Sequence, residues 1–261
     1  MILLQIVILA VVQGIAEFLP ISSTGHVVVL AAVFDQFGQP LEKKLTINIV
    51  LHVGTLLAIL VFYWRRIRRL LGEDRRVIAL LIVGTLPAAA VGLPLRLYSE
   101  GTFESALLAG FMFPLTGGML LWTTRLGDGN VTCRHLSYGR ALLIGVFQAI
   151  AILPGISRSG ATIAVGLGCG LKREEAAAFS FLLAIPAIGG AGLLELVAWL
   201  RESPGANSIG LLGIGAALSF AVGLASLAWL VRWLQQGRLH HFAWWLLLLG
   251  PAVIAWQWFW A

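Results

Sequence analysis

Apolar residues follow one another along this chain in long blocks rather than in stripes. Each block covers roughly 18–25 residues, the length that a helix needs to cross the hydrocarbon core of a membrane. Charged residues and glycines such as Gly72, Gly127 and Gly237 separate the blocks. A soluble helical bundle would instead carry polar stripes at helical spacing. The pattern therefore predicts an all-α polytopic membrane protein with six clear spans, at residues 46–64, 77–95, 105–123, 176–200, 209–231 and 242–260.

Two further apolar segments, residues 2–33 and 141–170, are interrupted at their centres by Leu-Pro followed by serines and glycines. Proline and clustered small residues break a helix, and exposed backbone at membrane depth is tolerated only where it lines a cavity within the protein. We therefore expect each segment to form a re-entrant helix hairpin, which enters and leaves the membrane on one side. The alternative is that each segment is an ordinary kinked span.

The two interrupted segments also resemble each other in sequence. Gln-Gly-Ile-Ala at 13–16 and Leu-Pro-Ile-Ser-Ser-Thr-Gly at 19–25 return as Gln-Ala-Ile-Ala at 148–151 and Leu-Pro-Gly-Ile-Ser-Arg-Ser-Gly at 153–160. Chance similarity of two apolar stretches does not easily place Gln, Leu-Pro and the serines in the same order. The order therefore indicates an internal duplication.

We interpret the chain as a single membrane domain, residues 1–261, made of two repeat halves, 1–125 and 140–261. Each half then consists of one hairpin followed by three spans. Because three is an odd number, the two halves have opposite orientations in the membrane. In inverted-topology repeats with broken helices, binding sites form where the breaks meet.

Composition agrees with a membrane location, since 59% of the 261 residues are hydrophobic, 11% are charged and the mean hydropathy is +0.92. The net charge of +6 does not indicate a nucleic-acid partner, because the basic residues gather at the ends of the spans. Thirteen of the eighteen lie in residues 65–76, 125–140, 172–173 and 232–238. The positive-inside rule makes these segments cytoplasmic, so that both termini and the mouth of the first hairpin face outward.

Other common sequence signals add little. No Lys or Arg precedes Lys43, so we expect residues 1–12 to remain in the protein rather than to act as a cleaved secretion signal. Cys133 and Cys169 lack the spacing of a zinc site or a disulfide framework, and we interpret both as bystanders.

Three ionisable residues, Glu17, His26 and Arg158, lie inside the interrupted segments. A charged group at membrane depth costs about 2.5–3.5 kcal/mol on insertion, so such residues are functional candidates by default. Gln13 precedes Glu17 by four residues and hence shares its helix face. The Glu17 carboxylate and the Gln13 amide oxygen can ligate a hard cation, together with phosphate oxygens and water. The alternative for Glu17 is a structural ion pair with Arg158.

The residues that follow each Leu-Pro supply further chemistry. Ser-Ser-Thr-Gly-His at 22–26 places hydroxyl nucleophiles close to an imidazole that can act as a general acid or base, although a serine here can equally cap a helix. Pro-Gly-Ile-Ser-Arg-Ser-Gly-Ala-Thr at 154–162 looks like an anion cradle, with glycines, hydroxyl donors and a helix N-terminus. The planar fork of Arg158 suits phosphate oxygens. Taken alone, such a loop could also bind a carboxylate or a sulfate.

The motifs at 13–26 and 154–162, together with Phe-Ser-Phe-Leu-Leu-Ala-Ile-Pro at 179–186, resemble the undecaprenyl-diphosphate phosphatase family, the bacitracin-resistance phosphatases of bacteria. The resemblance implies a multi-pass enzyme of the bacterial inner membrane that hydrolyses undecaprenyl diphosphate to undecaprenyl phosphate and inorganic phosphate. It implies a divalent cation, Mg²⁺ or Ca²⁺, and a site that opens to the periplasmic face. The product recycles the carrier for cell-wall synthesis, and bacitracin competes by sequestering the polyprenyl diphosphate substrate. A homodimer is a possible assembly.

The resemblance also implies which residues of this chain bind the metal, take part in catalysis and bind the substrate. The metal ligands fall on Gln13 and Glu17, and the catalytic residues are Glu17, Ser23, His26 and Arg158. Ser23 is either a covalent nucleophile or a residue that positions water, while His26 handles the proton. The substrate-binding residues expected on the hairpins are Thr24, Gly155, Ser157, Arg158, Ser159, Gly160 and Thr162.

This chain departs from the family pattern at several positions. Gln13 stands where many members have Glu, which leaves one firm carboxylate, and Ala16 stands where Thr is common. Asn48 and His52 replace residues that are often Asp and Gln, and we interpret His52 as a hydrogen-bonded core histidine. The rival function is a transporter of the polyprenyl phosphate carrier, because inverted repeats with midplane sites suit alternating access equally well.

Overall fold

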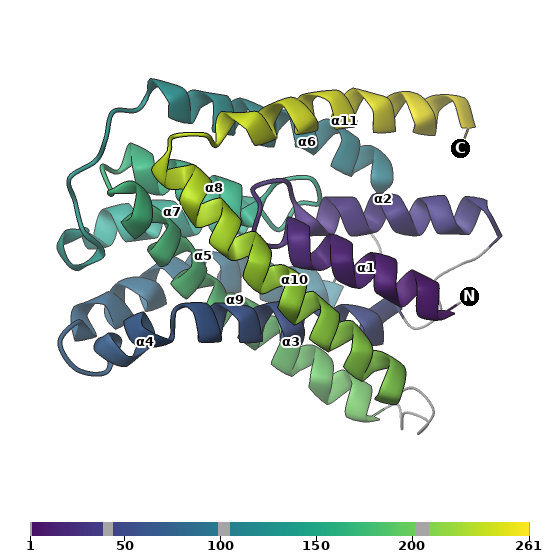
Figure 1. Cartoon of the computed structure of the whole chain (residues 1–261), viewed down its shortest axis with the longest axis horizontal. Helices are drawn as coiled ribbons and strands as arrows, with labels where there is room; N and C mark the ends of the chain where they lie inside the picture. The colour runs from purple at the N-terminus through teal and green to yellow at the C-terminus, as the bar shows by residue number, and fades with distance from the viewer. Residues whose placement is uncertain (1, 39–43, 99–104, 202–208, 261) are drawn as a thin grey trace.

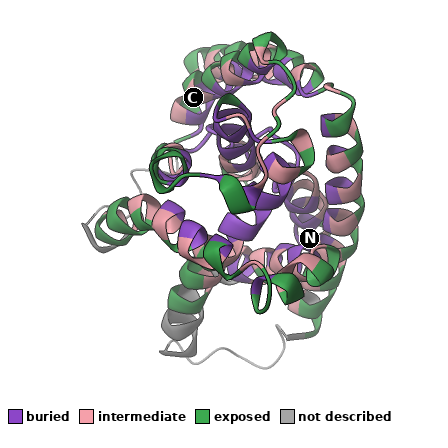
Figure 2. Cartoon of the chain, turned by 90° about the vertical axis from the view of Figure 1, so that its left-hand side faces the viewer, coloured by how far each residue is buried: buried purple, intermediate pink, exposed green. Residues whose placement is uncertain are grey.

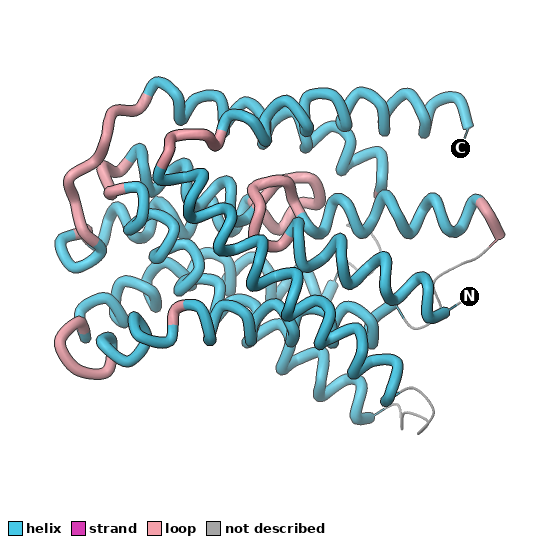
Figure 3. Tube along the Cα trace, viewed as in Figure 1, coloured by secondary structure: helices cyan, strands magenta, loops and turns pink. Residues whose placement is uncertain are grey.

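The computed structural model describes residues 2–38, 44–98, 105–201 and 209–260. Within these ranges the chain is helical, apart from turns and an isolated bridge between Val131 and Leu171. Figure 3 shows helices throughout, with the loops gathered at the centre and at the ends of the molecule. The elements are α1 (Ile2–Ala16), α2 (Ser23–Gln36), α3 (Lys44–Phe62), α4 (Trp64–Leu70), α5 (Arg75–Tyr98), α6 (Ala106–Trp122), η1 (Thr123–Arg125), η2 (Cys133–His135), α7 (Tyr138–Ile150), α8 (Arg158–Gly168), α9 (Arg173–Arg201), α10 (Ile209–Gln235) and α11 (His240–Trp260).

The six predicted spans correspond to the six long apolar helices. By length and composition, α5, α6, α9, α10 and α11 each suffice to cross a membrane. The sixth, α3, continues into α4 after a bend of 73° at Tyr63. The prediction of a polytopic all-α membrane protein is therefore confirmed.

Both interrupted segments form helix hairpins. In the first, α1 ends at Ala16 and α2 begins at Ser23, and in the second, α7 ends at Ile150 and α8 begins at Arg158. Figure 1 shows α1 and α2 running to the right of the molecule from a turn near its centre, whereas α7 and α8 lie to the left. The two hairpins thus extend toward opposite sides of the molecule in this view. The inverted-repeat relation between the two halves stays a prediction.

The basic residues are distributed unevenly between the two ends of the molecule. Both termini lie at one end of the molecule, where α2 also ends, while α4 and the turn before α11 lie at the other end (Figure 1). The second end carries the thirteen basic residues counted above. There the Glu175 carboxylate accepts hydrogen bonds from Arg66 Nη2 at 2.8 Å and from the Cys133 backbone N–H at 2.7 Å. Burial, followed by the neighbouring Glu175 charge, raises the pKa of the Cys133 thiol, which agrees with a bystander cysteine.

The exterior is apolar and the interior is tightly packed around the hairpin tips. Trp258 and Leu248 are 79% and 74% exposed, as expected of side chains that face lipid. Figure 2 shows buried residues along the middle of the bundle. At the tips, a Cβ atom on Gly25 would lie 2.7 Å from Phe113 Cε1 and 2.8 Å from the Gly155 nitrogen. The hairpin tips therefore approach each other at a distance that only glycine permits at position 25.

Candidate active site

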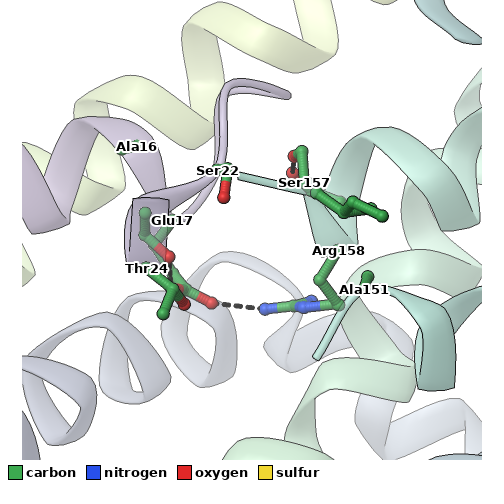
Figure 4. Close-up of a pocket in the computed structure, with 10 residues that line it drawn as sticks. Ala16, Glu17, Ser22, Thr24, Ala151, Ser157 and Arg158 are labelled. Carbon is green, nitrogen blue, oxygen red and sulfur yellow. Dashed lines mark hydrogen bonds and ion pairs between the residues drawn. The ribbon is translucent and has the colours of Figure 1, made fainter. Parts of the chain in front are cut away.

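A pocket lies where the two helix breaks meet. Figure 4 shows Glu17 and Arg158 pointing toward each other from opposite hairpins, with Ser22 and Ser157 beside them. Glu17 and Arg158 are 141 residues apart in the sequence, so the fold assembles the pocket from the two hairpins. The lining residues are Ala16, Glu17, Ser22, Ser23, Thr24, Ala151, Ile156, Ser157, Arg158 and Ser159.

The Glu17 carboxylate is buried at the centre of this pocket, with 7% of the residue exposed. Its Oε1 accepts a hydrogen bond from Arg158 Nη2 at 2.5 Å. Its Oε2 accepts from Ser23 Oγ at 2.8 Å and from Gln13 Nε2 at 3.0 Å. The ion pair with Arg158 that the sequence left open is therefore present at Oε1, and two further donors satisfy Oε2, as a buried charge requires.

One terminal nitrogen of Arg158 makes no hydrogen bond to the described part of the protein. While Nη2 contacts Glu17, Nη1 is buried and has no hydrogen-bond partner among the described residues. A buried guanidinium nitrogen without a partner is rare in folded proteins, and its natural partner is an oxyanion. Ser157 and Ser159 flank the arginine in the lining, with their Oγ atoms 3.2 Å apart. The arrangement fits a phosphate group better than any neutral ligand.

The other residues predicted for the second hairpin support the pocket from behind. Ser157 Oγ caps α8 by accepting from the Gly160 N–H at 3.1 Å. Thr162 Oγ1 donates to the Arg158 carbonyl at 2.7 Å and lies 2.6 Å from Ser180 Oγ. Gly155 has φ = +95°, which favours glycine. Gly155, Gly160 and Thr162 are not among the lining residues, and their contact with substrate stays a prediction.

The two serines of the first hairpin have different surroundings. Ser22, at φ = 71°, caps α2 and accepts hydrogen bonds from the backbone N–H groups of Gly25 at 3.3 Å and Gly155 at 3.1 Å. The capping alternative thus holds for Ser22, which also joins the two hairpin tips. Ser23 instead donates to Glu17, and Thr24 lines the pocket beside it. Ser23 is therefore the serine of this hairpin that contacts Glu17, and its catalytic role stays a prediction.

His26 is not among the lining residues. Its Nδ1 lies 2.8 Å from the Ser22 carbonyl oxygen, and its Nε2 lies 3.0 Å from Trp245 Nε1 on α11. Because an indole N–H can only donate, Nε2 accepts and Nδ1 carries the proton. The Phe113 ring packs against the imidazole at a centroid distance of 5.1 Å. In this arrangement His26 positions the Ser22 turn, and its role in proton transfer stays a prediction.

The structure brings a different histidine to Glu17. His52 Nε2 is 3.9 Å from Glu17 Oε2, and 31% of the His52 side chain is exposed. Its Nδ1 lies 2.8 Å from the Asn48 carbonyl oxygen, so the predicted hydrogen bond is present, but the partly exposed ring beside Glu17 is not a core histidine. Sequence reasoning did not place it beside the carboxylate, and the one available signal was its departure from the family pattern. Nothing in the sequence singled out Trp245.

Glu17 and Gln13 are the residues expected to bind a divalent cation. Glu17 provides carboxylate oxygens and Gln13 an amide oxygen, which are hard ligands suited to such an ion. Among the described residues there is no group of three or more His, Cys, Asp or Glu side chains of the kind that would enclose a metal alone. The donors therefore fit an ion that shares its coordination with phosphate oxygens and water.

The helices and this pocket define a polytopic membrane protein with a buried arginine–carboxylate site between two helix hairpins. The chain belongs to the family described as bacitracin resistance protein BacA, whose sequence profile matches residues 6–252. It is 51% identical over 253 residues to an undecaprenyl-diphosphatase of Rhodopirellula baltica, with 97% of each chain covered. It is 38% identical over 263 residues to that of Desulforapulum autotrophicum, covering 92% of this chain and 93% of the relative. The identity to the Methanosphaera stadtmanae undecaprenyl-diphosphatase is 37% over 277 residues, with 97% of each chain covered.

Proposed function

We propose that this protein hydrolyses undecaprenyl diphosphate to undecaprenyl phosphate and inorganic phosphate. The observation that carries the proposal is the unpaired Nη1 of Arg158, which lies in one pocket with the hydroxyls of Ser157 and Ser159 and with the Ser23–Glu17 pair. The names of the similar proteins supply the substrate. An anion site alone would also suit a carrier, but a hydroxyl oriented by a carboxylate beside that site supports catalysis.

Transfer of the terminal phosphoryl group breaks its bond to the bridging oxygen, which leaves with the lipid monophosphate. Arg158 and the adjacent hydroxyls are placed to stabilise the charge on the equatorial oxygens. Glu17 accepts the Ser23 hydrogen bond at 2.8 Å, and so is within reach of the proton that the attacking group loses. If Ser23 attacks, water then hydrolyses a phosphoserine; if Ser23 positions water, phosphate forms in one step.

We further propose that Glu17 and Gln13 hold a divalent cation, Mg²⁺ or Ca²⁺, when substrate is bound. The ion would supply positive charge beside the diphosphate oxygens. Support comes from the type of donors on this helix face and from the resemblance to the phosphatase family.

The enzyme is proposed to lie in the bacterial inner membrane, with the pocket open to the periplasmic face and the polyprenyl chain between the helices. The separation of basic residues to one end supports this orientation. Hydrolysis there returns the carrier lipid to cell-wall synthesis, and a faster return raises resistance to bacitracin, which sequesters the diphosphate.

The proposal is tested with purified protein in detergent, using farnesyl diphosphate as a soluble substrate. We expect release of inorganic phosphate that stops on addition of EDTA and resumes with excess Mg²⁺ or Ca²⁺. A transporter would release none, because detergent removes the membrane that it acts across. Absence of phosphate release under all these conditions would refute the assignment as a phosphatase.

A further inference from the structure

His52 lies on α3, outside both hairpins, yet its ring faces the carboxylate of the first hairpin. The Asn48 carbonyl oxygen, 2.8 Å from Nδ1, can only accept a hydrogen bond, so Nδ1 carries a proton and Nε2 is the ring nitrogen that faces Glu17. Histidines that bind metals are commonly held in this way, with the second ring N–H donated to a backbone carbonyl. The ring of His52 is therefore oriented as a ligand before any ion is bound.

The distance between His52 Nε2 and Glu17 Oε2 also agrees with a role for His52 as a metal ligand. At 3.9 Å, Nε2 and Oε2 are too far apart for a hydrogen bond between them, which needs roughly 2.7–3.2 Å. Two ligands that each lie about 2.0–2.2 Å from one ion can be separated by as much as about 4.2 Å. The gap thus accommodates a shared cation.

Gln13 completes the set of protein donors. Its amide nitrogen donates to Oε2 of Glu17, the oxygen that faces His52. When a cation takes that place, rotation of the amide presents its oxygen instead, which gives one carboxylate, one amide and one imidazole ligand.

We propose that His52 is a third protein ligand, with Glu17 and Gln13, of the divalent cation that accompanies the diphosphate. Nitrogen ligands raise the preference for Mn²⁺ and later first-row ions relative to Mg²⁺ and Ca²⁺. We therefore expect the imidazole of His52 to raise the affinity of the site for Mn²⁺ relative to its affinity for Mg²⁺. This inference rests on the proposed function, because the phosphate oxygens complete the coordination of the ion.

The test uses Mn²⁺ and the full-length protein in detergent with farnesyl diphosphate, followed by electron paramagnetic resonance. In the wild type we expect nitrogen hyperfine coupling from one histidine to bound Mn²⁺. His52→Gln should abolish that coupling and raise the dissociation constant for Mn²⁺ at least about tenfold. The matched control His135→Gln changes an exposed histidine at the basic end of the molecule and should leave both quantities unchanged.

The outcomes separate this inference from the proposed hydrolysis. Bound Mn²⁺ without histidine coupling in the wild type, or coupling that persists in His52→Gln, would overturn the inference even if phosphate is released. Coupling that His52→Gln abolishes, without phosphate release from any variant, would support the cation site and refute the hydrolysis. Should His52→Gln fail to fold, Gln13→Glu provides a second test. The Gln13→Glu variant should keep the nitrogen hyperfine coupling to Mn²⁺, and its dissociation constants for Mn²⁺ and Mg²⁺ should differ less than those of the wild type. Loss of the coupling in this variant would count against His52 as a ligand.

Discussion

Replacing Arg158 with lysine keeps a positive charge in the pocket but removes the planar fork. In the structure one terminal nitrogen of Arg158 contacts Glu17 at 2.5 Å, while the other is left for an oxyanion. A lysine ammonium is a single point of charge on a different stem, and it cannot hold both groups with the same geometry. Hydrogen bonds to charged groups contribute about 1.5–3 kcal/mol each.

Loss of one such bond in the transition state corresponds to a fall of about 10- to 150-fold in kcat/KM, since about 1.4 kcal/mol equals a factor of ten. The assay is phosphate release from farnesyl diphosphate by the purified variant, with thermal unfolding measured in parallel. Arg140→Lys, at an exposed position on α7, is the matched control and should retain full activity. A kcat/KM of Arg158→Lys within twofold of the wild type would show that Arg158 is an ordinary ion-pair partner, and the phosphate site would have to lie elsewhere.

Further changes test the other parts of the site. Glu17→Gln preserves shape and removes the charge, so we expect phosphate release to fall at least about 100-fold; full activity with the same response to metal would place the ion elsewhere. Trp245→Phe removes the donor to His26 Nε2 and should lower kcat about 2- to 12-fold in the same assay, whereas unchanged kcat would show that the indole does not position His26. In a background without native cysteines, a cysteine at Phe37 should react with an impermeant thiol reagent in intact spheroplasts. A cysteine at Gly72 should react only after lysis, and its labelling in intact cells would contradict the orientation.

The large features of the fold follow from local sequence. A block of apolar residues long enough to cross a membrane leaves a helix as the one arrangement that satisfies its backbone, so the six spans are predictable from length alone. The breaks are less local, because Pro20 and Pro154 interrupt their helices, whereas Pro114 lies inside the continuous helix α6 although Gly117 and Gly118 follow it. The same reasoning identifies Glu17 and Arg158 as candidates, since each is an ionisable group inside an apolar segment.

Which side chains meet in the pocket is not a local property. His26 is nine residues from Glu17 in sequence, yet α2 turns its ring toward Trp245 on α11. His52 is 35 residues from Glu17, and the packing of α3 brings its Nε2 to the carboxylate. The rotation of a helix about its own axis decides such contacts, and uniformly apolar helices carry little pattern that specifies this rotation. For the same reason the sequence alone did not distinguish the capping Ser22 from Ser23.

The charges of the pocket also bear on the cation. Its lining contains one acidic and one basic side chain, Glu17 and Arg158, which neutralise each other and allow the site to remain buried without substrate. A diphosphate brings at least two negative charges into this neutral environment, and the unpaired Nη1 of Arg158 offers hydrogen bonds but no additional charge. Burial of uncompensated charge costs several kcal/mol per ion, so positive charge from outside the protein would favour binding of the diphosphate. The divalent cation proposed for Glu17 and Gln13 would supply that charge, and the contact between Arg158 and Oε1 leaves Oε2, the oxygen next to Gln13, to hold it.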